Sequence, residues 1–287
     1  GEIGNLLIKR GAYRYARDYI EKQIQIANQL GDQYGVSMAL DNLAIVNIRL
    51  GDLTKVQEYF ETSIARDHEL GFRKSEANGL GNLGNLLVRL GKFDDALAAY
   101  ESQNLIGREL NSKVIQRDSF TNFGNYYLAR SEYPQALEHF QKALALDQEI
   151  GDQYGEGVDT LNAGTALRFL EKVKDALEYH QRALEIAQKI GDRYGEGNAF
   201  ANIGSDYKVL GELELAQQYF EKHLEIATEI GDIKGQADAL QNQASIDLQM
   251  DRNEQALKRL QEAIRLYRHI GSPEADKLEE FLNSPNA

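Results

Sequence analysis

Apolar residues recur at helical spacing along the chain, in two patterns that alternate with a constant period of 40 residues. Over residues 34–50 the apolar positions are Leu40, Leu43, Ala44 and Leu50, which lie three or four residues apart on most turns, as on one face of a helix. A second helical pattern follows over residues 53–70. The same two patterns return in each later period without insertion or deletion, so the sequence predicts a series of helix pairs.

Turn residues separate the predicted helices at fixed places in the period. A Gly-Asp pair stands at 31–32, 151–152, 191–192 and 231–232, where glycine can end one helix in the left-handed conformation and aspartate can cap the next. The segment at 151–157, Gly-Asp-Gln-Tyr-Gly-Glu-Gly, returns at 191–197 with one change. A fixed period of this length predicts a solenoid, in which each unit buries its apolar face against its neighbours.

Small residues also recur in register. The first helices share one column of them, made up of Ala44, Gly84, Gly124, Gly164, Gly204 and Ala244. The second helices share an alanine column, made up of Ala16, Ala96, Ala136, Ala176, Ala216 and Ala256, with Val56 as the exception. Glycine inside a helix costs about 1 kcal/mol relative to alanine. Its recurrence therefore indicates that two helices approach closely at this level.

Phe120, Phe123, Gly124, Tyr127, Ala136 and Phe140 follow the spacing aromatic-x2-Leu-Gly-x2-Tyr…Ala-x3-Phe, which resembles the tetratricopeptide repeat (TPR). The 40-residue period is similar to that of Pins/LGN-type adaptors and bacterial signalling TPR domains. The resemblance implies an all-α fold, a right-handed superhelix of about seven antiparallel helix pairs with a C-terminal capping helix. HEAT or armadillo repeats, with a period of about 40–47 residues, are the alternative, but they would not explain the glycine and alanine columns.

The resemblance covers the whole chain, so we expect one solenoid over residues 1–287. Residues 1–30 would be a truncated first repeat, 31–270 six complete periods, and 271–287 a capping helix, at about 274–283, with a tail. Ile3-Gly4 falls on the Leu-Gly positions of a first helix. We therefore expect that the chain starts within a helix and is part of a larger protein.

By analogy with TPR superhelices, the side of the first helices opposite their buried face lines a concave groove. One position there is always asparagine, and the next turn adds more amides and hydroxyls. Because an amide both donates and accepts hydrogen bonds, a column of asparagines can bind the backbone of an extended peptide. Shared ancestry or a hydrogen bond between repeats is the alternative explanation of the column. The amide candidates are Asn42, Asn82, Asn122, Asn162, Asn202, Asn242, Asn85 and Asn125.

The charge of the predicted groove differs from that of the chain. The net charge of −13 argues against nucleic-acid binding, and no apolar run is long enough to span a membrane. The groove positions nevertheless carry four basic residues, Arg49, Arg89, Arg168 and Lys208, against three acidic ones, Asp41, Asp118 and Asp238. A partner peptide with a few acidic side chains fits this surface better than a basic one.

The sequence contains no pattern typical of catalysis, of a metal site or of a cofactor site. It has no cysteine, which fits the reducing cytoplasm where we expect the chain. No two of the five histidines have metal-ligand spacing, and His180 stands where other repeats have phenylalanine, so we expect it to be a packing residue. We therefore expect no enzyme activity and no cofactor.

One predicted second helix departs from the pattern. Gln103, Asn104 and Gly107 interrupt its apolar positions, and Asn111 and Ile115 replace the glycines of the following linker. A repeat that has drifted in sequence explains these changes, and a hinge is the alternative.

Together these patterns favour a non-enzymatic protein-interaction module that binds an extended peptide or partner segment in an Asn-lined groove. The second interpretation is a ligand-sensing TPR domain of a multidomain signalling protein, such as a STAND-type ATPase, whose effector domain is not in this chain. A self-associating scaffold would predict exposed apolar terminal repeats, and the expected capping helix argues against it. The oligomeric state is not predicted.

Overall fold

The computed structural model describes residues 6–7 and 12–283, and it is all-helical over these residues. The residues predicted to open the chain within a helix, Ile3 and Gly4, lie outside the described part. The helices are α2 (Tyr13–Leu30), α3 (Gln33–Leu50), α4 (Val56–Glu69), α5 (Arg73–Arg89), α6 (Phe93–Glu109), α7 (Lys113–Ala129), α8 (Tyr133–Ile150), α9 (Gln153–Phe169), α10 (Val173–Ile190), α11 (Arg193–Val209), α12 (Leu213–Glu229), α13 (Ile233–Gln249), α14 (Asn253–His269) and α15 (Glu274–Leu282).

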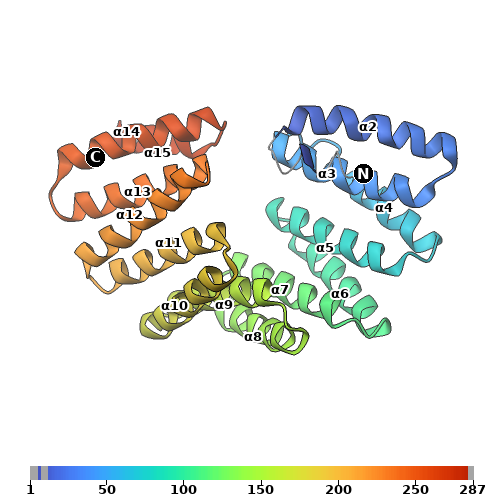
Figure 1. The fold of residues 1–287 in the computed structure, drawn as a ribbon, viewed down its shortest axis with the longest axis horizontal. Helices are drawn as coiled ribbons and strands as arrows, with labels where there is room; N and C mark the ends of the chain where they lie inside the picture. The colour runs from blue at the N-terminus through green and yellow to red at the C-terminus, as the bar shows by residue number, and fades with distance from the viewer. Residues whose placement is uncertain (1–5, 8–11, 284–287) are drawn as a thin grey trace. The chain divides into compact units, whose positions relative to one another are not determined.

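The helices form two compact units (Figure 1), unit 1 over Gly1–Glu132 and unit 2 over Tyr133–Ala287. Within unit 1 each helix from α2 to α7 packs against the next, and α5 also contacts α7. Within unit 2 each helix from α8 to α15 packs against the next, and α9 and α13 both contact α11. This succession of antiparallel neighbours confirms the predicted helix pairs in each unit. None of the described helices has the length and apolar character needed to cross a lipid bilayer.

The repeated Gly-Asp turns have the predicted geometry. Gly31 ends α2 with φ of 70°, in the left-handed region that glycine adopts without strain. The Asp32 carboxylate then accepts a hydrogen bond from the Gly35 backbone N–H at 2.8 Å and caps α3. A Cβ at residue 35 would lie 2.3 Å from that carboxylate, so the Asp32 side chain would have to move from its capping position. Asp152 and Asp192 cap α9 and α11 in the same way.

Four helix turns use other residues at the left-handed position, namely Asn111, Ser131, Glu171 and Asp251, with φ between 48° and 61°. Another turn delays a helix. The Asp52 carboxylate accepts hydrogen bonds from the Thr54 hydroxyl at 2.6 Å and from the Thr54 backbone N–H at 3.3 Å. Helix α4 therefore starts at Val56 and not at the expected residue 53. This local bond competes with the first helical turn.

The glycine column marks close packing between the two helices of a pair, as predicted. A Cβ on Gly84 of α5 would lie 2.3 Å from the ring of Tyr100 on α6. A Cβ on Gly204 of α11 would lie 2.9 Å from the Phe220 ring on α12. The close neighbour is therefore an aromatic side chain of the second helix, which is fully buried in both cases.

The residues suspected of interrupting a helix lie within α6, which is continuous from Phe93 to Glu109. Gln103 and Gly107 are both buried in it. The polar substitutions therefore change the packing around α6 and do not break the helix.

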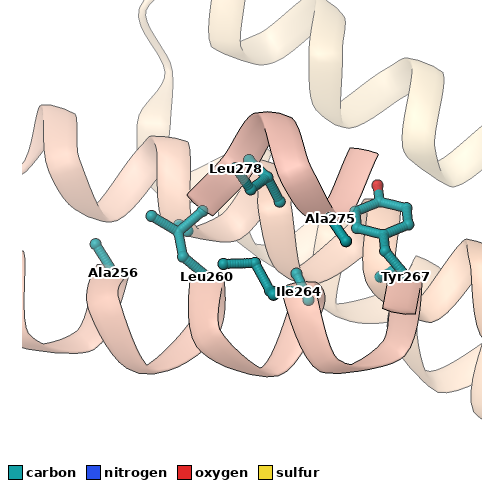
Figure 2. Packing of buried hydrophobic residues seen from close by; sticks show 9 residues of the cluster. Ala256, Leu260, Ile264, Tyr267, Ala275 and Leu278 are labelled. Carbon is teal, nitrogen blue, oxygen red and sulfur yellow. The ribbon is translucent and has the colours of Figure 1, made fainter. Parts of the chain in front are cut away.

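A short helix covers the last helix pair, at the place expected for a cap. Figure 2 shows Leu278 and Ala275 of α15 facing the apolar side of α14, where Leu260, Ile264 and Tyr267 lie. These residues form one buried cluster with Ala237 and Ala244 of α13. The apolar face that a last repeat would otherwise expose is thus covered.

Candidate functional site

The asparagine column lies on the first helix of each pair, and all six side chains are partly buried. Unit 1 carries Asn42 on α3, Asn82 on α5 and Asn122 on α7. Unit 2 carries Asn162, Asn202 and Asn242 on α9, α11 and α13. The column therefore has the placement that the period predicts, but its members differ in what they bind.

Asn122 is hydrogen-bonded to Gln103, one of the polar residues at an otherwise apolar position of α6. Its Nδ2 donates a hydrogen bond to Gln103 Oε1 at 3.0 Å. Gly81 of α5 leaves the space for this pair, because a Cβ there would lie 2.6 Å from Gln103 Nε2. Here the asparagine joins neighbouring helices, as the structural interpretation of the column expects.

Asn202 is bound even more fully, and its partner is another predicted site residue. Arg168 of α9 donates from Nη2 to Asn202 Oδ1 at 3.0 Å and from Nη1 to the Asn202 carbonyl at 3.2 Å. Asn202 Nδ2 donates to the carbonyl of Asn198 at 3.0 Å. The structure thus brings Arg168 and Asn202 together.

Arg168 also belongs to a buried ionic cluster that the sequence reasoning missed. Its Nη1 lies 3.1 Å from Asp206 Oδ1, and His180 Nδ1 lies 2.5 Å from Asp206 Oδ2. Asp206 and His180 are both completely buried. His180 does occupy the expected packing position, but it is also the hydrogen-bond partner of a carboxylate. The signal for this pair was present, since Asp206 is the one charged residue in a column otherwise filled by Val46, Leu86, Tyr126, Ala166 and Ile246.

Two more candidates contact neighbouring side chains. Lys208 Nζ donates to Ser245 Oγ at 2.6 Å, and partial burial lowers the pKa of Lys208. Tyr100 Oη donates to Asn85 Oδ1 at 2.8 Å, and burial raises the pKa of Tyr100. Asn125 and the two unit 1 arginines, Arg49 and Arg89, are exposed.

Asp41, one of the acidic residues of the predicted groove, has a perturbed pKa. Its pKa is raised from about 3.8 to about 6, with burial as the largest cause; a hydrogen bond from the Ser63 hydroxyl lowers it, and the nearby Asp67 carboxylate raises it. The folded chain therefore holds a proton on Asp41 more tightly than the unfolded chain does. Stability falls as the pH rises from about 4 to about 6, where the unfolded chain has released this proton and the folded chain has not.

We expect Asp41→Asn to raise the free energy of unfolding by about 1 kcal/mol at pH 7 and to leave it nearly unchanged at pH 4. The full shift of about two units corresponds to about 3 kcal/mol, and solvent screening of the partly exposed carboxyl reduces it. Urea denaturation followed by circular dichroism at pH 4, 5, 6 and 7 measures the difference. Asp18→Asn, on the exposed side of α2, controls for the loss of one negative charge. An equal gain at pH 4 and pH 7 would contradict the assignment.

Unit 2 has two neighbouring pockets at equivalent positions of consecutive repeats. The first, with a volume of about 280 Å³, is the apolar pocket, and the second, of about 390 Å³, is the polar pocket. The apolar pocket is lined by Tyr154, Gly157, Val158, Leu161, Asn162, Ala183, Ile186, Ala187, Ile190, Asp192, Tyr194, Gly195 and Asn198. The polar pocket is lined by Tyr194, Asn198, Ala201, His223, Asp232, Lys234, Gly235, Asp238, Gln241 and Asn242.

The asparagine column contributes one residue to each pocket, Asn162 to the first and Asn242 to the second. Within the described part of the chain, neither of these amides has a hydrogen-bond partner, in contrast to Asn122 and Asn202. The part of the predicted stripe that is hollowed is therefore the N-terminal half of the first helices. In unit 2 the C-terminal half of the stripe carries the bonds of Arg168 and Lys208.

Over the described residues, no three histidine, aspartate or glutamate side chains come together as a metal site would require. The ionisable groups of the two pockets are Asp192, His223, Asp232, Lys234 and Asp238, besides the tyrosines. What this arrangement offers is amide and carboxylate hydrogen bonding beside an apolar recess, which suits binding.

Comparison with known proteins places the chain among repeat proteins. The sequence profile of the tetratricopeptide repeat matches it five times, at residues 35–102, 75–149, 115–189, 157–229 and 195–269. A search of curated protein sequences gives no significant match.

Several solved structures share the fold. The apo form of the quorum sensor NprR from Bacillus thuringiensis has a TM-score of 0.74 at 16% identity and covers 92% of this chain and 74% of its own. A Rap protein complexed with Competence and Sporulation Factor has a TM-score of 0.70 at 14% identity, with 94% and 76% covered.

A third structure is a Pyrococcus horikoshii Signal Transduction ATPase with Numerous Domains (STAND) protein with a tetratricopeptide repeat sensor. Its TM-score is 0.67 at 20% identity over 93% of this chain, which spans 43% of the length of that protein. At these identities the likeness is one of fold. Profile matches over most of the chain, and helix pairs with the predicted period, lead to one conclusion: the chain belongs to the tetratricopeptide repeat family.

Proposed function

We propose that the chain is a non-enzymatic interaction module that binds an extended peptide or partner segment along the face that carries the asparagine column. The observation that supports this most directly is the pair of pockets in unit 2, each of which includes one asparagine of the column. Two recesses at equivalent places of consecutive repeats suit a ligand that runs from one repeat to the next. A chain of amide groups has this form, and both asparagines can bind its backbone.

Unit 1 offers the same column, but its described pocket, between α3 and α4, contains none of these asparagines. There Asn42 and Asn82, with the exposed Asn125, are the amides proposed to contact a partner, and Arg49 and Arg89 are the exposed basic residues. The preference for acidic partner side chains rests on these two arginines. In unit 2 the charge of Arg168 is offset by Asp206, and one N–H of Lys208 is already donated to the Ser245 hydroxyl, so both are less available to a ligand.

A sensory role within a larger signalling protein is the second candidate. The fold likeness to the STAND protein with a tetratricopeptide repeat sensor favours it, and this chain spans less than half of that protein. The two candidates are compatible at the level of the site, because a sensor also binds its ligand. Reading the gene upstream of Gly1 separates them, since a nucleotide-binding domain there would favour the sensor.

We expect Asn162→Ala together with Asn242→Ala to weaken peptide binding about tenfold while the protein stays folded. The probe is a phage-displayed library of random 12-residue peptides, selected on the immobilised 287-residue chain. Affinities of the selected peptides are then measured by fluorescence anisotropy. Loss of two amide contacts of modest net strength corresponds to about 1.4 kcal/mol, or a factor of ten.

Asn253→Ala is the matched control, since this exposed asparagine starts α14 and lines neither pocket. Urea denaturation verifies that all variants remain folded. If no peptide is enriched, or if the double variant binds as tightly as the control, the proposed function is wrong.

A further inference from the structure

The apolar and polar pockets lie at corresponding places 40 residues apart and share part of their frame, although their asparagines, Asn162 and Asn242, stand on different walls. Asp192 and Gly195 of the apolar pocket correspond to Asp232 and Gly235 of the polar pocket. These positions belong to the helix caps and are constant. The substitutions lie between them, so each pocket has its own chemistry on a common frame.

The apolar pocket is suited to one hydrophobic side chain. Val158, Leu161, Ile186 and Ile190 form its walls, and Tyr154 and Tyr194 stand at its edge with about half of their surface exposed. Its volume of about 280 Å³ is just below the range of about 300–1,000 Å³ in which drug-sized ligands bind. Gly157 contributes by having no side chain, since a Cβ there would lie 3.2 Å from Ile186.

In the polar pocket the equivalent positions carry polar or charged side chains. Val158 is replaced by Asn198, Asn198 by Asp238, and Tyr194 by Lys234. Lys234 Nζ is paired with Asp238 Oδ2 at 2.7 Å, and the other oxygen of Asp238 lies 2.5 Å from the Tyr267 hydroxyl. Asp232 starts α13 but, unlike Asp152 and Asp192, makes no capping hydrogen bond. The pocket therefore carries one net negative charge, and Asp232 is the carboxylate that its neighbours leave available.

His223 gives a second and independent indication of a ligand. It replaces Ala183 of the apolar pocket and is 5% exposed. No group of the described residues forms a hydrogen bond with its Nδ1. Burial lowers the pKa of His223, so the ring is neutral at neutral pH and one nitrogen is an acceptor. A buried polar atom without a partner is unfavourable, and a donor from a ligand would satisfy it.

The separation of the pockets sets the spacing of the ligand's side chains. The pockets lie between α9, α11 and α13, which contact one another in sequence. Packed helices lie about 8–10 Å apart. An extended chain of the polyproline type advances about 3.1 Å per residue and returns to the same face every third residue. Side chains at positions i and i+3 thus match two consecutive pockets.

We propose that the two pockets together recognise a peptide with a bulky apolar side chain followed, three residues later, by a lysine or arginine. The apolar side chain enters the recess of Val158 and Ile186. The basic side chain enters the polar pocket, where Asp232 supplies the charge and His223 accepts a hydrogen bond. This inference rests on the proposed function and adds the chemistry of the ligand to it.

The test uses the 287-residue chain and synthetic fluorescent 12-residue peptides with the core Leu-x-x-Lys, and matched peptides in which Lys is replaced by Glu or Ala, or in which Leu is replaced by Ser. We expect the Leu-x-x-Lys peptides to bind at least fivefold more tightly than each of the others. Asp232→Asn should remove the preference for Lys and leave the Ala peptides unaffected. Asparagine is also a good helix cap, so α13 should be preserved.

Two variants complete the design. Asp152→Asn makes the same change at a cap outside both pockets, and we expect it to leave every affinity unchanged. Val158→Asp places a charge in the apolar pocket, where the equivalent residues 118 and 238 are already aspartate, and should remove the preference for Leu over Ser.

The outcomes separate the two proposals. Binding that needs Asn162 and Asn242 but shows no preference for Lys, or a preference that survives Asp232→Asn, overturns the inference and leaves the proposed function standing. If no peptide binds at all, both are wrong.

Discussion

Replacing the buried polar pair of unit 2 by its apolar counterpart should have little effect on stability, although each single replacement should be costly. His180 and Asp206 lie 2.5 Å apart in the interior. The same two positions hold Phe220 and Ile246 one repeat later, and these pack together in a single apolar cluster. The prediction compares His180→Phe, Asp206→Ile and the double variant.

The single changes leave buried groups without partners. Asp206→Ile removes the hydrogen-bond partner of His180 and the ion-pair partner of Arg168, and His180→Phe leaves one Asp206 oxygen unpaired. Breaking a buried ion pair from one side costs about 3–5 kcal/mol. We therefore expect each single variant to lose about 3 kcal/mol, at the lower end of this range, because Arg168 keeps its hydrogen bonds to Asn202.

In the double variant no imidazole or carboxylate is left without a partner, and Arg168, which still loses Asp206, keeps its hydrogen bonds to Asn202. The double variant should therefore lie within about 1 kcal/mol of the wild type, because a well-packed apolar pair can replace a buried polar one at little cost. Equilibrium urea denaturation of the four proteins gives the coupling energy of the cycle. Additive losses would contradict the prediction and would mean that the two residues act independently. A phenylalanine at residue 180 has the space it needs, because Gly164 faces this position as Gly204 faces Phe220.

Gly84→Ala is expected to destabilise unit 1 by about 2 kcal/mol, although alanine favours helices. The gain in helix propensity is about 1 kcal/mol. Against it stands a Cβ only 2.3 Å from the Tyr100 ring. That ring cannot retreat easily, because it is fully buried, its hydroxyl is bonded to Asn85, and it meets Phe123 edge to face at 5.9 Å. Overpacking of a rigid core costs about 1–3 kcal/mol, and we expect the upper end for so short a contact, which leaves a net loss of about 2 kcal/mol.

Gly157→Ala is the matched control, because its Cβ would lie 3.2 Å from one atom of Ile186 and no ring is near. We expect its effect on the free energy of unfolding to be within about 0.5 kcal/mol. A second variant, Gly84→Ala with Tyr100→Leu, reproduces the Ala244 and Leu260 pair of the last repeat. It should lose less than the two single changes added together. Equal stability of Gly84→Ala and the wild type would contradict the prediction, because it would mean that the Tyr100 ring can move aside at no cost.

The period was sufficient to predict the helices, because the signal for each helix lies within that helix. The ends of the helices were predicted correctly where the sequence shows a capping residue, as at Asp32. The start of α4 was wrong by three residues, because Asp52 and Thr54 bind each other there. The glycine column correctly predicted close approach, but the partner proved to be the aromatic ring of the second helix. Side-chain size at one position does not reveal which atom of the neighbour fills the space.

The site was less predictable, because its contacts join residues far apart in the chain. Asn122 and Gln103 are separated by 19 residues, and Arg168 and Asn202 by 34. An asparagine column therefore looks uniform in sequence while some members are bonded to neighbouring helices and others are open. His180 and Asp206 are polar residues in two columns that are otherwise apolar and whose members pack on each other. Two polar substitutions at contacting positions predict a buried pair better than either substitution alone.

The apolar and polar pockets share their cap residues and differ in their walls, a combination that appears only when the two repeats are compared in three dimensions.

The repeated recess has a consequence for how such a surface can change over evolutionary time. Because the shared cap residues and the variable wall residues of these pockets occupy different positions of the 40-residue period, duplication of one period adds one more recess for a side chain. Point substitutions at the lining then alter its preference without disturbing the helices that frame it. A binding surface assembled in this way can be lengthened, shortened or reordered by recombination between copies, and its selectivity can diversify one recess at a time.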